Sequence, residues 1–295
     1  GITMRELKIL AVVVALTLIT YWGVEPYAHH EMHPPVAPAD FAFSDVKESV
    51  ADVTALEGNA TSGEALVTAN CTACHSIESK GFPQVMDNAS SGSAYGVTPP
   101  DLGSAGKLYN ATYLAAFIKD PATASRVAHK FVDGRAHPMP SYNWMQPQEI
   151  ADMVAYLKSI APKEMTNKEV YADACQRCHG IKYADMKGGS MAAFTSPNDI
   201  KGYMGKLPPD LSQYIKSRGH EYLETFINNP QKHLEGTAMP RVGLNEESQA
   251  QVISYLEEIG DSNKAQREEL GPKFLIYLVI FAIFGFLWKA SKWRD

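Results

Sequence analysis

Cysteine is scarce in this sequence, and its few copies are all paired. Among 295 residues there are four cysteines, which form two Cys-x-x-Cys pairs: Cys71 with Cys74, and Cys175 with Cys178. In an exported protein, cysteines would first suggest disulfide bridges. No cysteine is left over once each pair has a joint role, so we interpret the pairs as two chemical sites.

A basic excess is also missing. With 27 Lys+Arg and 33 Asp+Glu, the formal net charge is −6, which gives no reason to expect nucleic-acid binding. Carboxylates are concentrated between Glu25 and Asn59, where seven of them accompany a single basic residue, Lys47. We interpret residues 25–59 as a solvated acidic linker in preference to a docking segment.

No stretch alternates apolar and polar residues convincingly enough to predict a β-strand. Apolar residues instead recur with the helical spacing i, i+3, i+4. The two clearest sets are Leu114, Phe117 and Ile118, and Leu223, Phe226 and Ile227. A proline follows each set, at Pro121 and Pro230, and is expected to end the helix. The sequence therefore predicts an all-α protein.

Long apolar runs occur near both ends of the chain. Residues 9–24 are at the short limit for crossing a bilayer, and Lys8 can extend toward the interface. A cleaved signal peptide is the alternative, but no small-x-small site follows. The second run, residues 274–288, is apolar on every side of a helix, and Pro272 before it suits a first helical turn. We expect a transmembrane helix in residues 1–24 and another in residues 263–295.

Charge predicts how these helices are oriented. Basic residues lie at the outer end of each run: Arg5, Lys8, Lys289, Lys292 and Arg294. The positive-inside rule places both of these ends in the cytoplasm. Residues 25–271 are then expected outside, in the bacterial periplasm or its equivalent, with the protein in the inner membrane.

The region between the two runs repeats one plan of five features. They are Cys-x-x-Cys-His (71–75 and 175–179), Pro-Pro-Asp-Leu (99–102 and 208–211), Tyr-Leu-x-x-Phe-Ile-x-x-Pro (113–121 and 222–230), Met-Pro (139–140 and 239–240) and a closing helical pattern (149–157 and 249–256). Five matched features in one order indicate duplication. We place the two domains at residues 60–162 and 163–262.

Cys-x-x-Cys-His is the attachment motif of a c-type haem. The two thiols form thioethers with the haem vinyl groups, and the adjacent histidine reaches the iron. A bare Cys-x-x-Cys could instead be a zinc knuckle or a redox pair, but a histidine follows both times. The sequence predicts two covalent haem c groups, held by Cys71, Cys74, Cys175 and Cys178, with His75 and His179 as iron ligands.

The second axial ligand is predicted from position in the repeat. Met139 and Met239 each precede a proline and lie just before the closing helix, whereas Met153, Met165 and Met204 suit core packing. The competing histidines, His129, His137 and His233, do not match across the repeat. Ligation by histidine and methionine raises the potential and leaves no open position at iron.

Outer hydrogen bonds hold an axial histidine in place. The carbonyl groups of Pro100 and Pro209 are candidates to accept from His75 and His179. That these prolines only shape a turn is an equally weighted alternative.

Each half resembles a class I cytochrome c domain. The whole chain, with its opening YWGVEPYAHHEMH (residues 21–33) and its C-terminal apolar run, is similar to the di-haem subunit of cytochrome bc complexes from epsilonproteobacteria. The resemblance implies a subunit of a dimeric quinol–cytochrome c reductase, with menaquinone as the implied quinone. Its implied partners are a cytochrome b subunit, a Rieske iron–sulfur protein as donor, and a soluble or oxidase-bound cytochrome c as acceptor. The more familiar cytochrome subunit of these complexes carries one haem, so which haem meets the Rieske cluster does not transfer.

Two other classes of protein carry comparable haem motifs. The di-haem subunit of a cbb-type haem–copper oxidase would normally lack an apolar run like residues 274–288. A di-haem peroxidase needs one iron open to peroxide, which the paired Met-Pro motifs argue against.

Overall fold

The computed structural model describes residues 3–32, 37–189 and 196–293. Arg294, one of the basic residues used to predict topology, and His33, at the end of the opening motif, lie outside these ranges. The chain divides into two compact units, residues 1–38 and residues 39–295, and each is described by itself.

The first unit is one helical rod. It comprises α1 (Met4–Ile19), a π-helical turn (Thr20–Val24) and α2 (Glu25–Met32). Thr3 and Glu6 form a capping box that satisfies backbone N–H groups at its start. The rod is 29 residues long, apolar enough to cross a membrane, and has no buried residue within the unit. Helix therefore continues past the predicted end at residue 24 into a more polar segment.

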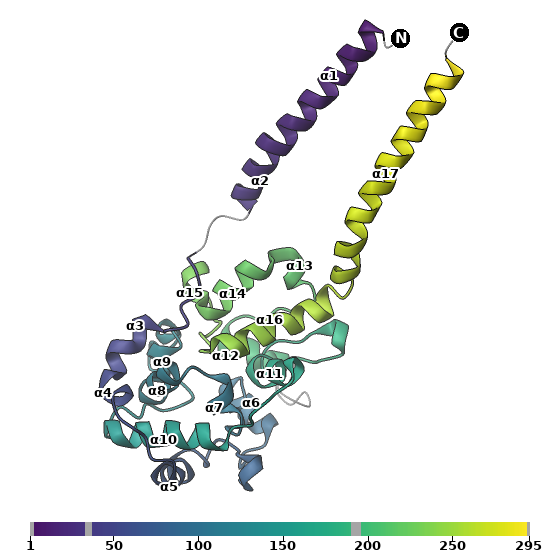
Figure 1. Cartoon of the computed structure of the whole chain (residues 1–295). Coiled ribbons are helices and arrows are strands. Elements are labelled where there is room, and N and C mark those ends of the chain that lie inside the picture. Colours follow the sequence, from purple (N-terminus) through teal and green to yellow (C-terminus); the bar gives the residue numbers. More distant parts are fainter. Residues whose placement is uncertain (1–2, 33–36, 190–195, 294–295) are drawn as a thin grey trace. The chain divides into compact units, whose positions relative to one another are not determined.

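The second unit holds two helical domains in tandem and ends in a long helix (Figure 1). The first contains α5 (Ala60–Asn70), α6 (Asn88–Tyr95), α7 (Ala105–Leu108), α8 (Ala111–Lys119), α9 (Pro121–Ala124) and α10 (Pro147–Ile160). The second contains α11 (Asn167–Ala174), α12 (Pro197–Met204), α13 (Tyr214–Arg218), α14 (His220–Asn228), α15 (Pro230–His233) and α16 (Glu246–Gly260). Helix α17 (Lys264–Lys292) follows. The described residues form no strand, only isolated bridges, so the all-α prediction is confirmed.

In each domain the first helix packs against the last one. Helix α5 contacts α10, and α11 contacts α16 (Figure 1). Gly63 makes close approach possible in the first pair, because a Cβ there would lie 2.0 Å from the carbonyl oxygen of Asp152. Apolar clusters lie around each pair, including Val67 and Ile150 in the first domain and Val170 and Ile253 in the second. Each domain thus has its own core.

Part of the expected acidic linker belongs to the first core. Residues 44–54 form α3 (Ser44–Lys47), a 3₁₀ turn (Glu48–Val50) and α4 (Ala51–Thr54). Four side chains here are buried among α8 and α10 residues: Phe43, Val46, Val50 and Val53. Interpreting residues 25–59 as a solvated linker is therefore wrong for this stretch. Its apolar residues recur three or four positions apart and form one face of these turns, while the carboxylates stay outside.

The two domains are joined by more than their connecting segment. The N–H of Asn110 donates to the carbonyl of Gly243 (2.9 Å), and the N–H of Asn245 donates to Leu108 (2.9 Å). Leu108 of the first domain lies in the core cluster of the second. Gly243 has φ of +80°, and a Cβ there would fall 1.8 Å from the ring of Tyr113. Only glycine allows this approach.

Helix α17 differs from expectation at its start. It begins at Lys264, so Pro272 lies inside the helix and not in its first turn. Ion pairs from Lys264 to Glu257 and from Arg267 to Asp261 connect its first turn to the end of α16. The helix is 29 residues long, none of its hydrophobic span is buried, and it could cross a membrane.

Candidate haem-attachment sites

Each Cys-x-x-Cys-His motif forms one turn directly after the first helix of its domain. Cys71 is the C-cap residue of α5, and Cys175 is that of α11. In the first turn, the N–H of His75 donates to the carbonyl of Cys71 (2.9 Å), and in the second that of His179 donates to Cys175 (2.8 Å). All four thiols are free of disulfides. Each turn therefore offers two sulfurs and an imidazole from five consecutive residues.

Both histidines are held by the predicted proline carbonyls. Nδ1 of His75 lies 2.7 Å from the oxygen of Pro100, and Nδ1 of His179 lies 2.8 Å from that of Pro209. A carbonyl can only accept, so Nδ1 carries the proton and donates. The lone pair of Nε2 is then available to a metal. Burial lowers the pKa of His75 and of His179, which favours the neutral imidazole that a metal needs.

The loop that carries each proline is fixed by the next aspartate. The carboxylate of Asp101 accepts from the N–H groups of Glu78 (2.9 Å) and Gly103 (2.7 Å). Asp210 accepts in the same way from Lys182 (2.7 Å) and Ser212 (3.0 Å). We did not single out either aspartate from the sequence, although both belong to the repeated Pro-Pro-Asp-Leu motif.

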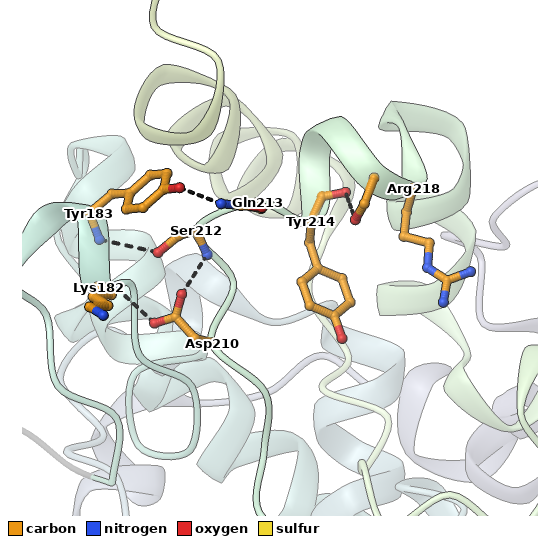
Figure 2. A pocket seen from close by; sticks show the side chains of 8 residues that line it. Lys182, Tyr183, Asp210, Ser212, Gln213, Tyr214 and Arg218 are labelled. Carbon is orange, nitrogen blue, oxygen red and sulfur yellow. Dashed lines mark hydrogen bonds between the residues drawn. The ribbon is translucent and has the colours of Figure 1, made fainter.

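A depression open to solvent lies beside the second of these loops. It has a volume of about 660 Å³. Figure 2 shows Asp210 between Lys182 and Ser212, with Tyr183 and Gln213 joined by a hydrogen bond above them. The side chains that line it are polar or aromatic.

Burial also affects the thiols. It raises the pKa of Cys71 and of Cys175 to about 12, and it raises the pKa of Cys178. Neighbouring Cys74 adds to the effect on Cys71. The described residues contain no group of three or more His, Cys, Asp and Glu side chains arranged to hold a metal ion.

The two methionine segments share one backbone contact. The N–H of Met139 lies 3.1 Å from Nδ1 of His137, and the N–H of Met239 donates to Oγ1 of Thr237 (3.3 Å). Each partner lies two residues before its methionine, and both methionines are half-buried. The two methionines thus share a contact to the residue two positions before them and a similar burial, while their bond to iron stays a prediction.

Two of the three competing histidines pack against aromatic rings, and the third is exposed. The ring of His137 lies 4.9 Å from that of Phe131, centroid to centroid, and its Nδ1 faces the backbone of Met139. The ring of His233 lies 5.7 Å from that of Tyr222. His129 is exposed on a 3₁₀ turn. His137 and His233 nevertheless each pack against the matching phenylalanine of the repeat, with ring centroids 6.1 Å from Phe117 and 6.0 Å from Phe226, although they do not align in the sequence.

Sequence reasoning missed Arg177, the third residue of the second motif. Its Nη1 donates to the carbonyl of Thr98 (3.2 Å) in the loop that leads to Pro100. Thus a residue between Cys175 and Cys178 contacts the loop that holds His75. Its Nε is buried and finds no acceptor among the described residues. Haem carries carboxylate groups, so an unpaired guanidinium N–H beside an attachment turn fits that group.

These features define a c-type cytochrome with two attachment sites. In each site two thiols can hold a haem covalently and the histidine can bind its iron, which would supply one-electron transfer.

The cytochrome c family matches residues 60–161 and 166–260. The chain therefore belongs to the cytochrome c family. Two domains of this family imply two covalently bound haem c groups, so the predictions of cofactor and of tandem cytochrome c domains are confirmed. The protein carries electrons.

Two known proteins are similar to the chain. A cytochrome c-553-like protein of Synechocystis sp. (strain ATCC 27184 / PCC 6803 / Kazusa) is 30% identical over 125 residues, which cover 42% of this chain and 91% of the relative. Among solved structures, a chain of a structure described as a hyperthermophilic respiratory Complex III is 17% identical in sequence. The match covers 99% of the present chain and 98% of that chain. Its TM-score is 0.34, which is too low to support an argument about arrangement.

Proposed function

We propose that this chain is the di-haem electron-transfer subunit of a membrane-bound quinol–cytochrome c reductase. It receives electrons from a Rieske iron–sulfur protein and passes them to a soluble or oxidase-bound cytochrome c. One observation carries the proposal: two complete attachment turns lie on one chain between two apolar helices, each 29 residues long. The chain alone is an electron carrier, and it takes part in catalysis as a subunit.

The site geometry favours a carrier over an enzyme acting on substrate at iron. His75 and His179 are each held on one side by a proline carbonyl. Met139 and Met239 supply the other axial position in the proposed arrangement, which closes both irons to substrate. Arg177 of the second attachment turn donates to the carbonyl of Thr98, in the loop that leads to Pro100 of the first site, and this contact between the two sites supports transfer between their haems.

Assignment to a cytochrome bc complex rests on the resemblance of the whole chain, including its C-terminal apolar helix. A di-haem subunit of a cbb-type oxidase would normally lack a counterpart of α17. Within the complex the partners are a cytochrome b subunit and a Rieske protein, and the complex is dimeric. The haem domains lie in the periplasm, and the two spans cross the bacterial inner membrane.

The proteins that co-purify with the chain test this function. We expect extraction in mild detergent to yield a b-type cytochrome and an iron–sulfur protein, identified by mass spectrometry and by their reduced spectra. A chain carrying only residues 1–262 provides the control, because it lacks α17 and should recover less of the b-type cytochrome. Recovery of a copper-containing oxidase in place of these partners would refute the proposal.

Topology gives an independent prediction. Lys289, Lys292 and Arg294 follow the apolar part of α17, and the positive-inside rule places them in the cytoplasm. Alkaline phosphatase fused after Asp295 should be inactive, because this enzyme matures only outside the cytoplasm. The same reporter fused after Gly260, before α17, should be active. Activity in both fusions would mean that α17 does not span the membrane.

A further inference from the structure

Arg241 is a buried charge two residues after Met239. Its side chain is only 1% exposed. Nη1 donates to both carboxylate oxygens of Asp45, at 2.8 and 2.7 Å, and Nε donates to the carbonyl of Asn228 at 3.0 Å. The guanidinium carbon lies 4.4 Å from the centroid of the Phe43 ring. A charge is tolerated at such depth only when it is paired and hydrogen-bonded, and Arg241 meets both conditions.

The partners of Arg241 come from three parts of the fold. Asn228 ends α14 in the second domain, whereas Asp45 and Phe43 belong to the segment that precedes the first domain. The backbone of Arg241 adds two contacts with the first domain. Its N–H donates to the carbonyl of Ser125 (2.9 Å), and its carbonyl accepts from the hydroxyl of Tyr113, both in the first domain.

The repeat shows what is special about this position. Ser141 is the counterpart of Arg241 in the first domain, two residues after Met139. Its Oγ donates to the carbonyl of Lys119 (2.6 Å), and Lys119 occupies the place of Asn228 in the matched helix. Both residues thus bind the same carbonyl of their own domain. Only the arginine is long enough to reach beyond that carbonyl to Asp45.

The segment around Asp45 is itself fixed to the second domain. The N–H of Asp40 donates to Oδ1 of Asn228 (3.0 Å), and Nδ2 of Asn228 donates to the carbonyl of Asp40 (3.2 Å). Asp45 also pairs with Arg126 (2.7 Å), which is partly exposed and belongs to the first domain. Arg126 therefore shares the carboxylate with Arg241 from the exposed side.

We propose that Arg241 is a positioning residue for Met239. By joining Asn228 to Asp45 it holds the Met239-Pro240 segment against residues 40–45 and the first domain. Methionine ligation in the second domain then depends on contacts from outside that domain, whereas the segment after Met139 is held by Lys119 of its own domain. The inference rests on the proposed role of Met239 as an iron ligand, but not on any partner protein.

Two variants of the full-length chain, purified in detergent, test the proposal. Arg241→Gln removes the charge and the reach to Asp45, and Asp45→Asn keeps the volume but removes the anionic partner. Arg126→Gln is the matched control, because it removes the other arginine on the same carboxylate. The measurements are the charge-transfer absorption band that ferric haem shows when methionine sulfur is bound, a potentiometric titration of both haems, and the covalent haem content.

We expect both Arg241→Gln and Asp45→Asn to keep two covalent haems. Each should lose about half of the intensity of the methionine charge-transfer band, which is the share that the second haem contributes. One midpoint potential should fall while the other stays, and Arg126→Gln should behave as the unmodified chain does. If Arg241→Gln does not accumulate as folded protein, Asp45→Asn alone decides. A full band and two unchanged potentials in the folded variants would overturn the proposal. Equal effects on both haems would also overturn it, because they would indicate general destabilisation.

The result is separable from the proposed function. Failure to recover a b-type cytochrome would refute the assignment to a cytochrome bc complex and leave these spectra unaffected. Conversely, unchanged spectra in the Arg241 and Asp45 variants would leave the assignment to the complex intact.

Discussion

Replacing Cys175 and Cys178 together with alanine should reduce the chain from two covalent haems to one. These residues are the only thiols in the second attachment turn, and thioether bonds cannot form without them. His179 could still bind iron, but a haem held by axial bonds alone is removed by acid–acetone whereas a thioether-linked haem is not. A pyridine haemochrome assay on the protein left after extraction should therefore report one haem per chain in place of two.

The matched variant changes Cys71 and Cys74 in the first domain. It should also leave one haem, because the two turns have the same hydrogen bonds from histidine to the first cysteine. The two variants should differ in which midpoint potential remains, and together they assign both potentials. Two acid-resistant haems in either variant would show that the cysteines removed in that variant are not what attaches a haem.

Local sequence patterns predicted the geometry around the two Cys-x-x-Cys-His motifs, while haem attachment at these residues stays a prediction. The Cys-x-x-Cys-His turns, the proline carbonyls beside His75 and His179, and the placement of the helices before and after them all follow from short motifs. Such motifs are readable because the residues that act together are close in sequence, and the duplication repeats each one. Pro100 lies 25 residues from His75. It could still be predicted, because the same Pro-Pro-Asp-Leu motif occurs around Pro209 in the second copy of the repeat.

Long-range contacts between unlike residues were not readable. Arg241 and Asp45 are 196 positions apart, and the repeat gave no signal because the counterpart of Arg241 is a serine. The acidic composition of residues 25–59 also concealed a buried face. Phe43, Val46, Val50 and Val53 are interspersed with polar residues, and their burial depends on α8 and α10, which come later in the chain. Tertiary packing decided these cases, not local preference.

Pro272 illustrates a different limit. Proline favours the first turn of a helix, so the sequence predicts that this helix begins near Pro272. The structure begins α17 at Lys264, where ion pairs to Glu257 and Asp261 support an earlier start. Each exposed ion pair of this kind contributes little to stability. Together the two pairs extend α17 at its N-terminal end, ahead of residues that are strongly apolar.

Replacing Met239 with histidine should lower the potential of one haem and leave the other nearly unchanged. Met239-Pro240 occupies the place of Met139-Pro140 in the repeat, whereas the nearby His233 falls opposite Phe131, which cannot bind iron. The structure holds the backbone of Met239 through Thr237 much as it holds that of Met139 through His137. Imidazole is a stronger donor than thioether to ferric iron, so the substitution stabilises the oxidised state.

The expected fall is on the order of 0.1–0.2 V, within the roughly 0.8 V range that axial ligands cover. The haem content should stay at two, because attachment depends on Cys175 and Cys178. Met139→His is the matched control and should lower the other potential. Quinol-driven electron flow should slow in the variant whose haem lies on the obligatory path and continue in the other. A Met239→His protein with both midpoint potentials unaltered in a redox titration would show that another residue binds the second iron.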